Sequence, residues 1–218
     1  MRVRYDRQIT HLRDDLLRMG SMVEYALQRA LKSLETWDTI EAAQVSKEDV
    51  NIDEVWRSIE AETIRMLAIQ QPILATDLRF MTVVIAIAGE LERIGDYANS
   101  IAKRVRRATS RPSLMTPPNQ LNEMATLVIQ MIHTSLDSFL QQSAQKAEDL
   151  VSSEERVDLL AEEARTELIN QAKNDPIKFE AAVDMLDVVY ALERSADRAT
   201  NIAERVIFMV TAEVETIN

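Results

Sequence analysis

Long stretches of this 218-residue sequence place an apolar side chain at every third or fourth position. In the first stretch these positions are Ile9, Leu12, Leu16, Met19, Val23, Ala26 and Ala30. That spacing brings the apolar side chains onto one face of an α-helix. The whole chain contains only 3 glycines and 5 prolines, whereas β-sandwiches and barrels need frequent turn residues. The sequence therefore predicts an all-α protein.

Interruptions of the apolar pattern divide the first half into three long helices. The first gives way near Asp38 and Thr39, either of which can cap a second helix by accepting backbone N–H bonds. The second helix is predicted to end near Gln70, because Pro72 disfavours helical geometry in the residue before it. The third is predicted to begin near Thr76.

A proline-rich segment, Arg111–Pro118, is the predicted linker between two halves of the chain. Beyond it we expect helices at 119–146 and 149–173, a stop at Pro176 and a last helix that ends near residue 212. The sequence thus predicts six long helices, three on each side of the linker.

The second half of the chain repeats the first. A shift of 101 positions superimposes residues 91–105 on residues 192–206, and 9 of these 15 residues are identical. We therefore expect two tandem, pseudo-symmetric three-helix bundles, one formed by residues 1–111 and the other by residues 112–218.

Acidic residues four positions apart lie beside the apolar stripes, so their carboxylates project from one helix face. The pairs are Asp49 with Asp53 and Glu92 with Asp96 in repeat one, and Glu154 with Asp158 and Glu193 with Asp197 in repeat two. Chance predicts about six acidic pairs of this spacing, and the chain has seven, so the number alone is uninformative. Their positions are informative, because the pairs recur in matching helices at offsets of 105 and 101.

Two such pairs on neighbouring helices would repel each other unless a cation lay between them. We therefore predict metal binding, with solvated helix faces as the alternative. Oxygen-only ligands suit Mg²⁺, Mn²⁺, Ca²⁺ or iron, and four carboxylates can bridge more than one ion. Asn99 and Asn201 lie within a turn of the motif aspartates, and we expect each to hydrogen-bond a carboxylate.

Several kinds of catalytic site are missing from the sequence. The chain has no cysteine, which excludes disulfides, thiolate metal sites and thiol nucleophiles. The two histidines, His11 and His133, lack the preceding acidic residue that a ferritin-like di-iron oxidase needs. Neither a Gly-x-Ser-x-Gly motif nor a glycine-rich phosphate loop occurs. We therefore expect no catalytic residues.

Charge and hydropathy restrict the partners and the compartment. The formal net charge of -11 argues against nucleic-acid binding, which depends on basic surface. No apolar run approaches the ~20 residues needed to cross a bilayer. The N-terminus lacks the apolar segment of a secretory signal, so a cytoplasmic protein is expected.

The motifs together resemble the PhoU family, regulators of phosphate uptake in bacteria and archaea. The matching segments are Arg4-Tyr5-Asp6, Gln71-Pro72, Ala75-Thr76-Asp77-Leu78-Arg79, Glu90-Leu91-Glu92-Arg93-Ile94-Gly95-Asp96, Leu192-Glu193-Arg194 with Asp197, and Asn201-Ile202-Ala203-Glu204. The similarity covers nearly the whole chain in the family's order. It implies two similar three-helix bundles whose acidic motifs bind multinuclear clusters of iron or zinc, with the eight acidic residues above as ligands.

The resemblance also implies a regulatory role without chemical turnover. Family members are negative regulators of the phosphate-starvation response, commonly homodimers, that link the ATPase of the phosphate ABC transporter to a sensor histidine kinase. Association with the membrane would then be peripheral and through these partners. Many members have histidine after the motif aspartate, where this chain has Tyr97 and Arg198. Metal identity and nuclearity are therefore expected to differ, and Arg198 would place a positive charge near the second site.

Two other functions remain open at this level. A metal-dependent phosphohydrolase would use the same carboxylates to polarise a substrate and activate water. A purely structural helical scaffold would behave alike with and without metal, whereas a cation that binds only the native state raises its stability.

Overall fold

The computed structural model describes the whole chain except residues 1, 70–71, 109–114, 215 and 217–218. This described part contains six long α-helices, one short α-helix and a 3₁₀ turn, and no strand. The elements are α1 (Arg2–Thr36), α2 (Thr39–Ile69), α3 (Ala75–Ala108), α4 (Asn119–Gln141), α5 (Ala144–Glu148), α6 (Val151–Asn174), η1 (Pro176–Lys178) and α7 (Phe179–Thr211). The prediction of an all-α protein with six long helices is confirmed.

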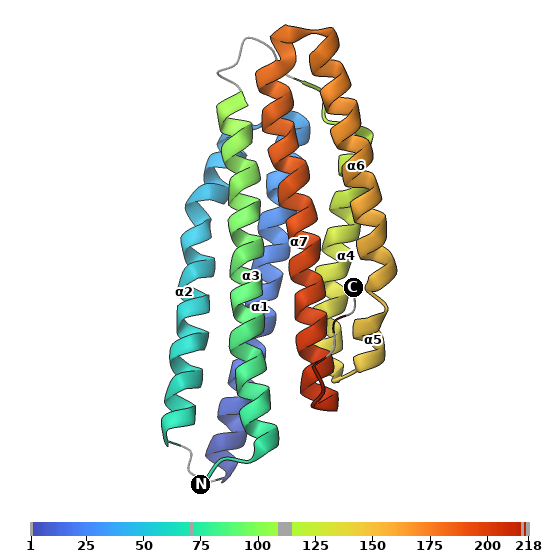
Figure 1. Cartoon of the computed structure of the whole chain (residues 1–218). Coiled ribbons are helices and arrows are strands. Elements are labelled where there is room, and N and C mark those ends of the chain that lie inside the picture. The colour runs from blue at the N-terminus through green and yellow to red at the C-terminus, as the bar shows by residue number, and fades with distance from the viewer. Residues whose placement is uncertain (1, 70–71, 109–114, 215, 217–218) are drawn as a thin grey trace.

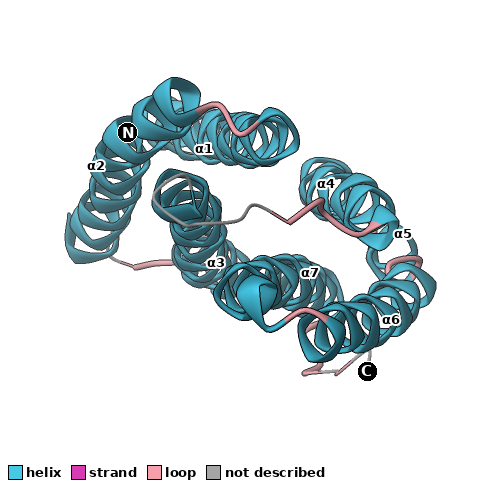
Figure 2. Cartoon of the chain, turned by 90° about the horizontal axis from the view of Figure 1, so that it is seen from above, coloured by secondary structure: helices cyan, strands magenta, loops and turns pink. Residues whose placement is uncertain are grey.

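The long helices run along one axis and form an elongated bundle (Figure 1). Viewed from above, α3 and α7 lie side by side at the centre, with α2 beside α3 and α6 beside α7 (Figure 2). α1 and α4 close the opposite side. α3 and α7 run antiparallel, and Arg104 Nη2 lies 2.9 Å from Asp187 Oδ2 across their contact. The two repeats are therefore joined mainly through their third helices.

Both repeats contribute to one continuous hydrophobic core. Its α1 face meets α4 closely at Gly20, where an added Cβ would lie only 2.2 Å from Leu136 Cδ1. The predicted boundary between residues 111 and 112 falls within residues 109–114, which are outside the described part. The division into two bundles of residues 1–111 and 112–218 stays a prediction.

The start of α2 is set by a local capping interaction. Trp37 adopts a left-handed conformation with φ of 55°, and Asp38 Oδ1 then accepts from the backbone N–H of Ile40 and Glu41 at 3.0 Å. Asp38 rather than Thr39 therefore caps α2. The predicted end of α2 at Gln70 lies outside the described residues.

The predicted helix 119–146 is wrong at its end. α4 stops at Gln141 because Gln142 turns into the left-handed region with φ of 52°. Ser143 Oγ then accepts from Lys146 N at 3.3 Å and caps the separate helix α5. α4 spans 23 residues, whereas its counterpart α1 spans 35.

No helix in the described ranges is both long and apolar enough to span a membrane.

Candidate functional site

Four of the predicted ligands gather where α2 packs beside α3. Asp49 and Asp53 lie on α2, and Glu92 and Asp96 lie on α3. Burial raises the pKa of Glu92, and the charges of Asp96, Asp53 and Asp49 raise it further. Because this repulsion requires proximity, the four carboxylates form one group, which we call the α2–α3 cluster.

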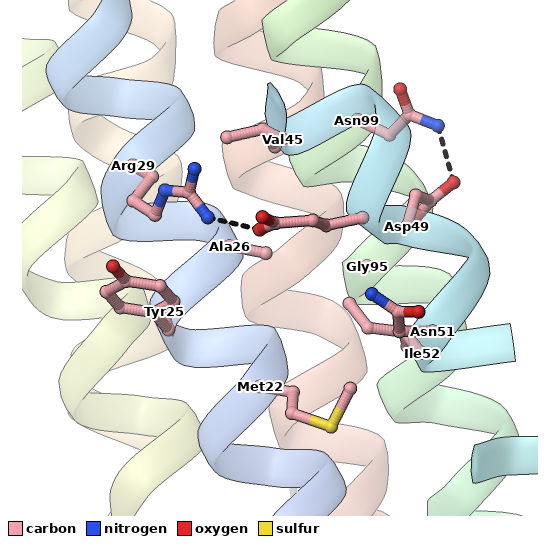
Figure 3. Close-up of a pocket in the computed structure, with 11 residues that line it drawn as sticks. Met22, Tyr25, Ala26, Arg29, Val45, Asp49, Asn51, Ile52, Gly95 and Asn99 are labelled. Carbon is pink, nitrogen blue, oxygen red and sulfur yellow. Dashed lines mark hydrogen bonds and ion pairs between the residues drawn. The ribbon is translucent and has the colours of Figure 1, made fainter. Parts of the chain in front are cut away.

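α2 approaches α3 closely at a glycine. A Cβ at Gly95 would lie 3.2 Å from Ile52 Cγ2 and 3.8 Å from Asp49 Oδ1, so a larger residue would require the Ile52 side chain to shift. Next to it, Asn99 Nδ2 donates a hydrogen bond to Asp49 Oδ2 (Figure 3). The Oδ1 atom of Asn99 is buried and has no hydrogen-bond partner. The cluster is thus held by tight packing and leaves one buried oxygen unsatisfied.

A cavity of about 90 Å³ lies beside Asp49 and Asn99, between α1, α2 and α3 (Figure 3). Arg29 on α1 lines this cavity and forms ion pairs with Glu41 and Glu48 of α2. The positive charge nearest to the cavity is therefore already paired with other acidic residues of α2.

Few cations face the α2–α3 cluster. Arg57 Nη2 lies 2.9 Å from Asp53 Oδ2, but the Arg57 side chain is 58% exposed. Arg93 Nε is 3.9 Å from Glu92 Oε2 and is also largely exposed. Among the described residues neither Asp49 nor Asp96 takes part in an ion pair. The cluster therefore retains most of its negative charge, since exposed pairs contribute little.

The other four predicted ligands gather between α6 and α7. Burial raises the pKa of Glu154 and Asp158 on α6, and carboxylates of α7 raise both further. The charge of Asp197 acts on Glu154, and the charges of Glu193 and Asp197 act on Asp158. We call this group the α6–α7 cluster. The structure thus brings together all four residues in each repeat, as the sequence predicted.

Arginines compensate the α6–α7 cluster. Arg165 forms an ion pair with Glu193, and Arg194 forms one with Asp197. Burial raises the pKa of Asp197, whereas Arg194 and Arg198 oppose that rise. The cluster opens into a pocket of about 600 Å³ that Arg194 and Arg198 also line.

Side chains of α7 also connect this cluster to repeat one. Arg198 Nη1 lies 3.1 Å from Glu90 Oε2, and Asn201 Nδ2 donates to the same oxygen at 3.3 Å. The hydroxyl of Tyr97 on α3 raises the pKa of Arg194. The expectation that Arg198 brings positive charge to the second site is confirmed. Asn201 does hydrogen-bond a carboxylate, although that carboxylate belongs to the other repeat.

Neither cluster is a ready-made coordination sphere. Among the described residues no group of three or more acidic or histidine side chains is placed so that it could hold a metal ion. The donor set of the α2–α3 cluster still suits a hard cation, because it combines four carboxylates with the unsatisfied Oδ1 of Asn99. At the α6–α7 cluster, arginines pair with Glu193 and Asp197, two of the four carboxylates that a cation would need. Ligation by the eight residues therefore stays a prediction.

The sequence analysis did not identify two residues of the site, Arg165 and Glu90. Arg165 lies seven positions after Asp158, a spacing that returns a side chain to the same helix face and was an available signal. Glu90 is part of the acidic motif segment, but its contact with Arg198 depends on how α3 and α7 pack. No sequence spacing predicts that contact.

Comparison with known proteins finds one family and several full-length relatives. The family described as PhoU domain matches residues 16–105 and 121–206. The chain is 33% identical over 214 residues to the phosphate-specific transport system accessory protein PhoU homolog of Clostridium acetobutylicum, covering 98% of this chain and 97% of that protein. It is 29% identical over 218 residues to the homolog of Streptococcus pneumoniae serotype 4, covering 100% of both.

Solved structures agree with this relationship. The crystal structure of PhoU from Pseudomonas aeruginosa matches with a TM-score of 0.90 and 30% identity, covering 96% of this chain and 100% of that one. PhoU from Streptococcus pneumoniae matches with a TM-score of 0.88 and 28% identity, covering 97% of this chain and 99% of that one. Two domain matches, full-length relatives and the shared fold show that this chain belongs to the PhoU family.

Proposed function

We propose that this chain is a regulatory accessory protein of a phosphate transport system that binds cations and acts through protein contacts. The relatives named above are accessory proteins rather than enzymes, which supports a role without chemical turnover. We place the chain in the cytoplasm, as a homodimer that reaches the membrane only through its partners.

Cation binding is supported above all by the α2–α3 cluster. Burial and mutual repulsion raise the pKa values of Asp49 and Glu92, so the metal-free fold carries unfavourable negative charge there. A bound cation, in one or several copies, would neutralise that charge. Carboxylate and amide oxygens suit Mg²⁺, Mn²⁺, Ca²⁺ or iron, and the family resemblance adds zinc.

The cluster joins α2 to α3, so neutralising it would fix the angle between these helices. α3 in turn contacts α7 through Glu90, Arg198 and Asn201, which links the two repeats. We infer that this arrangement determines which surface is offered to the ATPase of a phosphate ABC transporter and to a sensor histidine kinase. Through these contacts the protein would act as a negative regulator of phosphate uptake.

The test is a double variant, Asp96→Ala with Asp197→Ala, that removes one carboxylate from each cluster. We expect the purified variant to lose stoichiometric metal in elemental analysis and to lose its co-purification with the transporter ATPase. Glu35→Ala with Glu148→Ala, two exposed acidic residues outside the clusters, is the matched control. Full metal content in the double variant would contradict the ligand assignment.

A further inference from the structure

A second acidic surface lies apart from both clusters, along the outer face of α6. It forms a groove of about 800 Å³ beside the start of α4, and its lining includes Gln120, Leu159, Glu162, Glu163, Glu167 and Gln171. We call it the α4–α6 groove. Its lining contains three carboxylates and no basic residue. A surface of this composition attracts cationic groups.

The corresponding surface of repeat one is charge-balanced. A shift of 105 positions places Arg57 of α2 at Glu162 of α6, and Arg65 at Asn170. Both arginines form ion pairs along α2, with N–O distances of 2.9 and 2.7 Å. α6 has no equivalent arginines, and Glu162 and Glu163 form no ion pair within the described residues. The internal symmetry is therefore broken in favour of negative charge.

The groove also contains an exposed apolar side chain. Leu159, which lines it, is 59% exposed. At Leu159 the shift of 105 places Glu54 in repeat one, so this apolar contact is also specific to repeat two.

The carboxylates of the groove leave hydrogen-bond acceptors available to a ligand. Gln120 Oε1 is buried without a hydrogen-bond partner at the edge of the groove. Glu167 accepts one hydrogen bond, from Gln171 Nε2 at 2.9 Å, and keeps its second carboxylate oxygen available. A ligand with N–H donors and positive charge would satisfy these groups, whereas an acidic ligand would be repelled.

We propose that the α4–α6 groove binds a basic amphipathic helix of a partner protein. Lysine or arginine side chains of that helix meet Glu162, Glu163 and Glu167, and its apolar face packs on Leu159. Helices that present an apolar stripe beside charged residues commonly bind grooves between two helices. The inference rests on the adaptor function proposed above and names one surface for it.

The experiment titrates the full-length, ¹⁵N-labelled protein with a short synthetic helical peptide that carries lysines on one face and leucines on the other. It is run in 10 mM Mg²⁺ and again in EDTA. We expect backbone amide shifts confined to α6 and the start of α4 under both conditions. Glu162→Lys with Glu163→Lys should weaken peptide binding at least about tenfold, because it reverses two of the three negative charges in the groove. A tenfold loss corresponds to ~1.4 kcal/mol.

Two control variants distinguish binding at the α4–α6 groove from a general attraction between a basic peptide and an acidic protein. Glu35→Lys with Glu54→Lys makes the same change in net charge on exposed positions outside the groove and should leave the affinity within about twofold. Leu159→Asp should also weaken binding, although it adds negative charge, because the apolar contact is lost. Shifts concentrated at the α2–α3 or α6–α7 cluster, or concentration-dependent self-association through α6 without peptide, would overturn the proposal.

The outcome is separable from that of the proposed function. If the transporter ATPase co-purifies with Glu162→Lys/Glu163→Lys as well as with the unaltered protein, and the peptide shifts lie elsewhere, the groove proposal fails while the adaptor function stands. If the peptide binds the groove but no transporter ATPase co-purifies with the unaltered protein, the adaptor function fails.

Discussion

The α2–α3 cluster and the α6–α7 cluster occupy matching places in the two repeats, but the arginines paired with the α6–α7 cluster are less exposed than those paired with the α2–α3 cluster. In repeat two, Arg165, Arg194 and Arg198 face the carboxylates. In repeat one, Glu60 stands at the position of Arg165, and Tyr97 stands at that of Arg198. The internal repeat has thus kept the acidic motif while changing its surroundings.

This difference predicts different behaviour toward cations. An acidic group whose counter-charges are largely exposed gains more from a cation, whereas a group paired with less exposed arginines must first lose those ion pairs. We therefore expect the α2–α3 cluster to be the tighter site and the α6–α7 cluster to be occupied only at higher cation concentration.

The largest effect should come from removing one carboxylate of the α2–α3 cluster. We expect Glu92→Gln to weaken the tightest Mn²⁺ binding by about 10- to 100-fold in isothermal titration calorimetry, as loss of a metal-site group typically does. Glu193→Gln, the equivalent change in repeat two, should leave that tight step nearly unchanged. If Glu193→Gln removed the tight step and Glu92→Gln did not, the order of the two sites would be reversed.

The next effect concerns the arginines of repeat two. Arg165→Gln should strengthen Mn²⁺ binding at the α6–α7 cluster by about tenfold, because one competing positive charge is gone. The same variant should lower the stability of the metal-free protein by about 1 kcal/mol in urea unfolding. Arg57→Gln is the control in repeat one, and there the exposed pair with Asp53 should contribute less than about 0.5 kcal/mol. If Arg165→Gln left the Mn²⁺ affinity of the α6–α7 cluster unchanged, pairing with arginines would not explain why the two clusters differ.

A smaller effect is expected on stability without metal. Since the pKa of Glu92 is raised, its ionised form disfavours the folded state at neutral pH. Glu92→Gln should therefore raise the melting temperature of the EDTA-treated protein by about 2 °C, while reducing the further rise on adding a low concentration of Mn²⁺. A lower melting temperature in EDTA would show that the carboxylate is stabilised by contacts within the fold.

The smallest effect is expected at Glu24, where burial raises the pKa of a carboxylate that lies outside both acidic clusters. Burial raises the pKa of Glu24 on α1, and His133 of α4, whose Nδ1 is 3.7 Å from Glu24 Oε1, opposes the rise. A raised folded-state pKa gives stability that is complete below the unfolded pKa near 4.5 and is lost as pH rises through the folded value.

Glu24→Gln removes this dependence. The difference in unfolding free energy between Glu24→Gln and the unaltered protein should be smallest near pH 4 and grow toward pH 7, in favour of glutamine. Urea unfolding in EDTA at several pH values measures it. A difference that shrinks with rising pH would have the wrong sign and would indicate that the pair with His133 outweighs burial.

Local sequence signals predicted most of the helices. Apolar spacing located the six long helices. The sequence offered Asp38 or Thr39 as the cap of α2, and the structure shows Asp38 accepting from backbone N–H groups two and three residues away. The break after Gln141 was missed because Gln142 enters the left-handed region without the help of glycine or proline. The capping side chain of Ser143 was the only local signal for it.

The candidate site was predictable where it depends on helix periodicity and not where it depends on packing. Four-residue spacing and the internal repeat grouped Glu92 with Asp96, and the structure places α2 carboxylates beside them. The link between Glu90 and Arg198 joins residues 108 positions apart across the α3–α7 contact. Its register is set by side-chain packing of two long helices, which no spacing within one helix encodes.

Anomalous X-ray diffraction from crystals grown with a low concentration of Mn²⁺ tests most directly whether the α2–α3 cluster is a cation site. We predict a strong anomalous peak between Asp53 and Glu92, and a weaker peak or none beside Arg194. A peak only at the α6–α7 cluster, or no peak at either cluster at saturating Mn²⁺, would contradict this account.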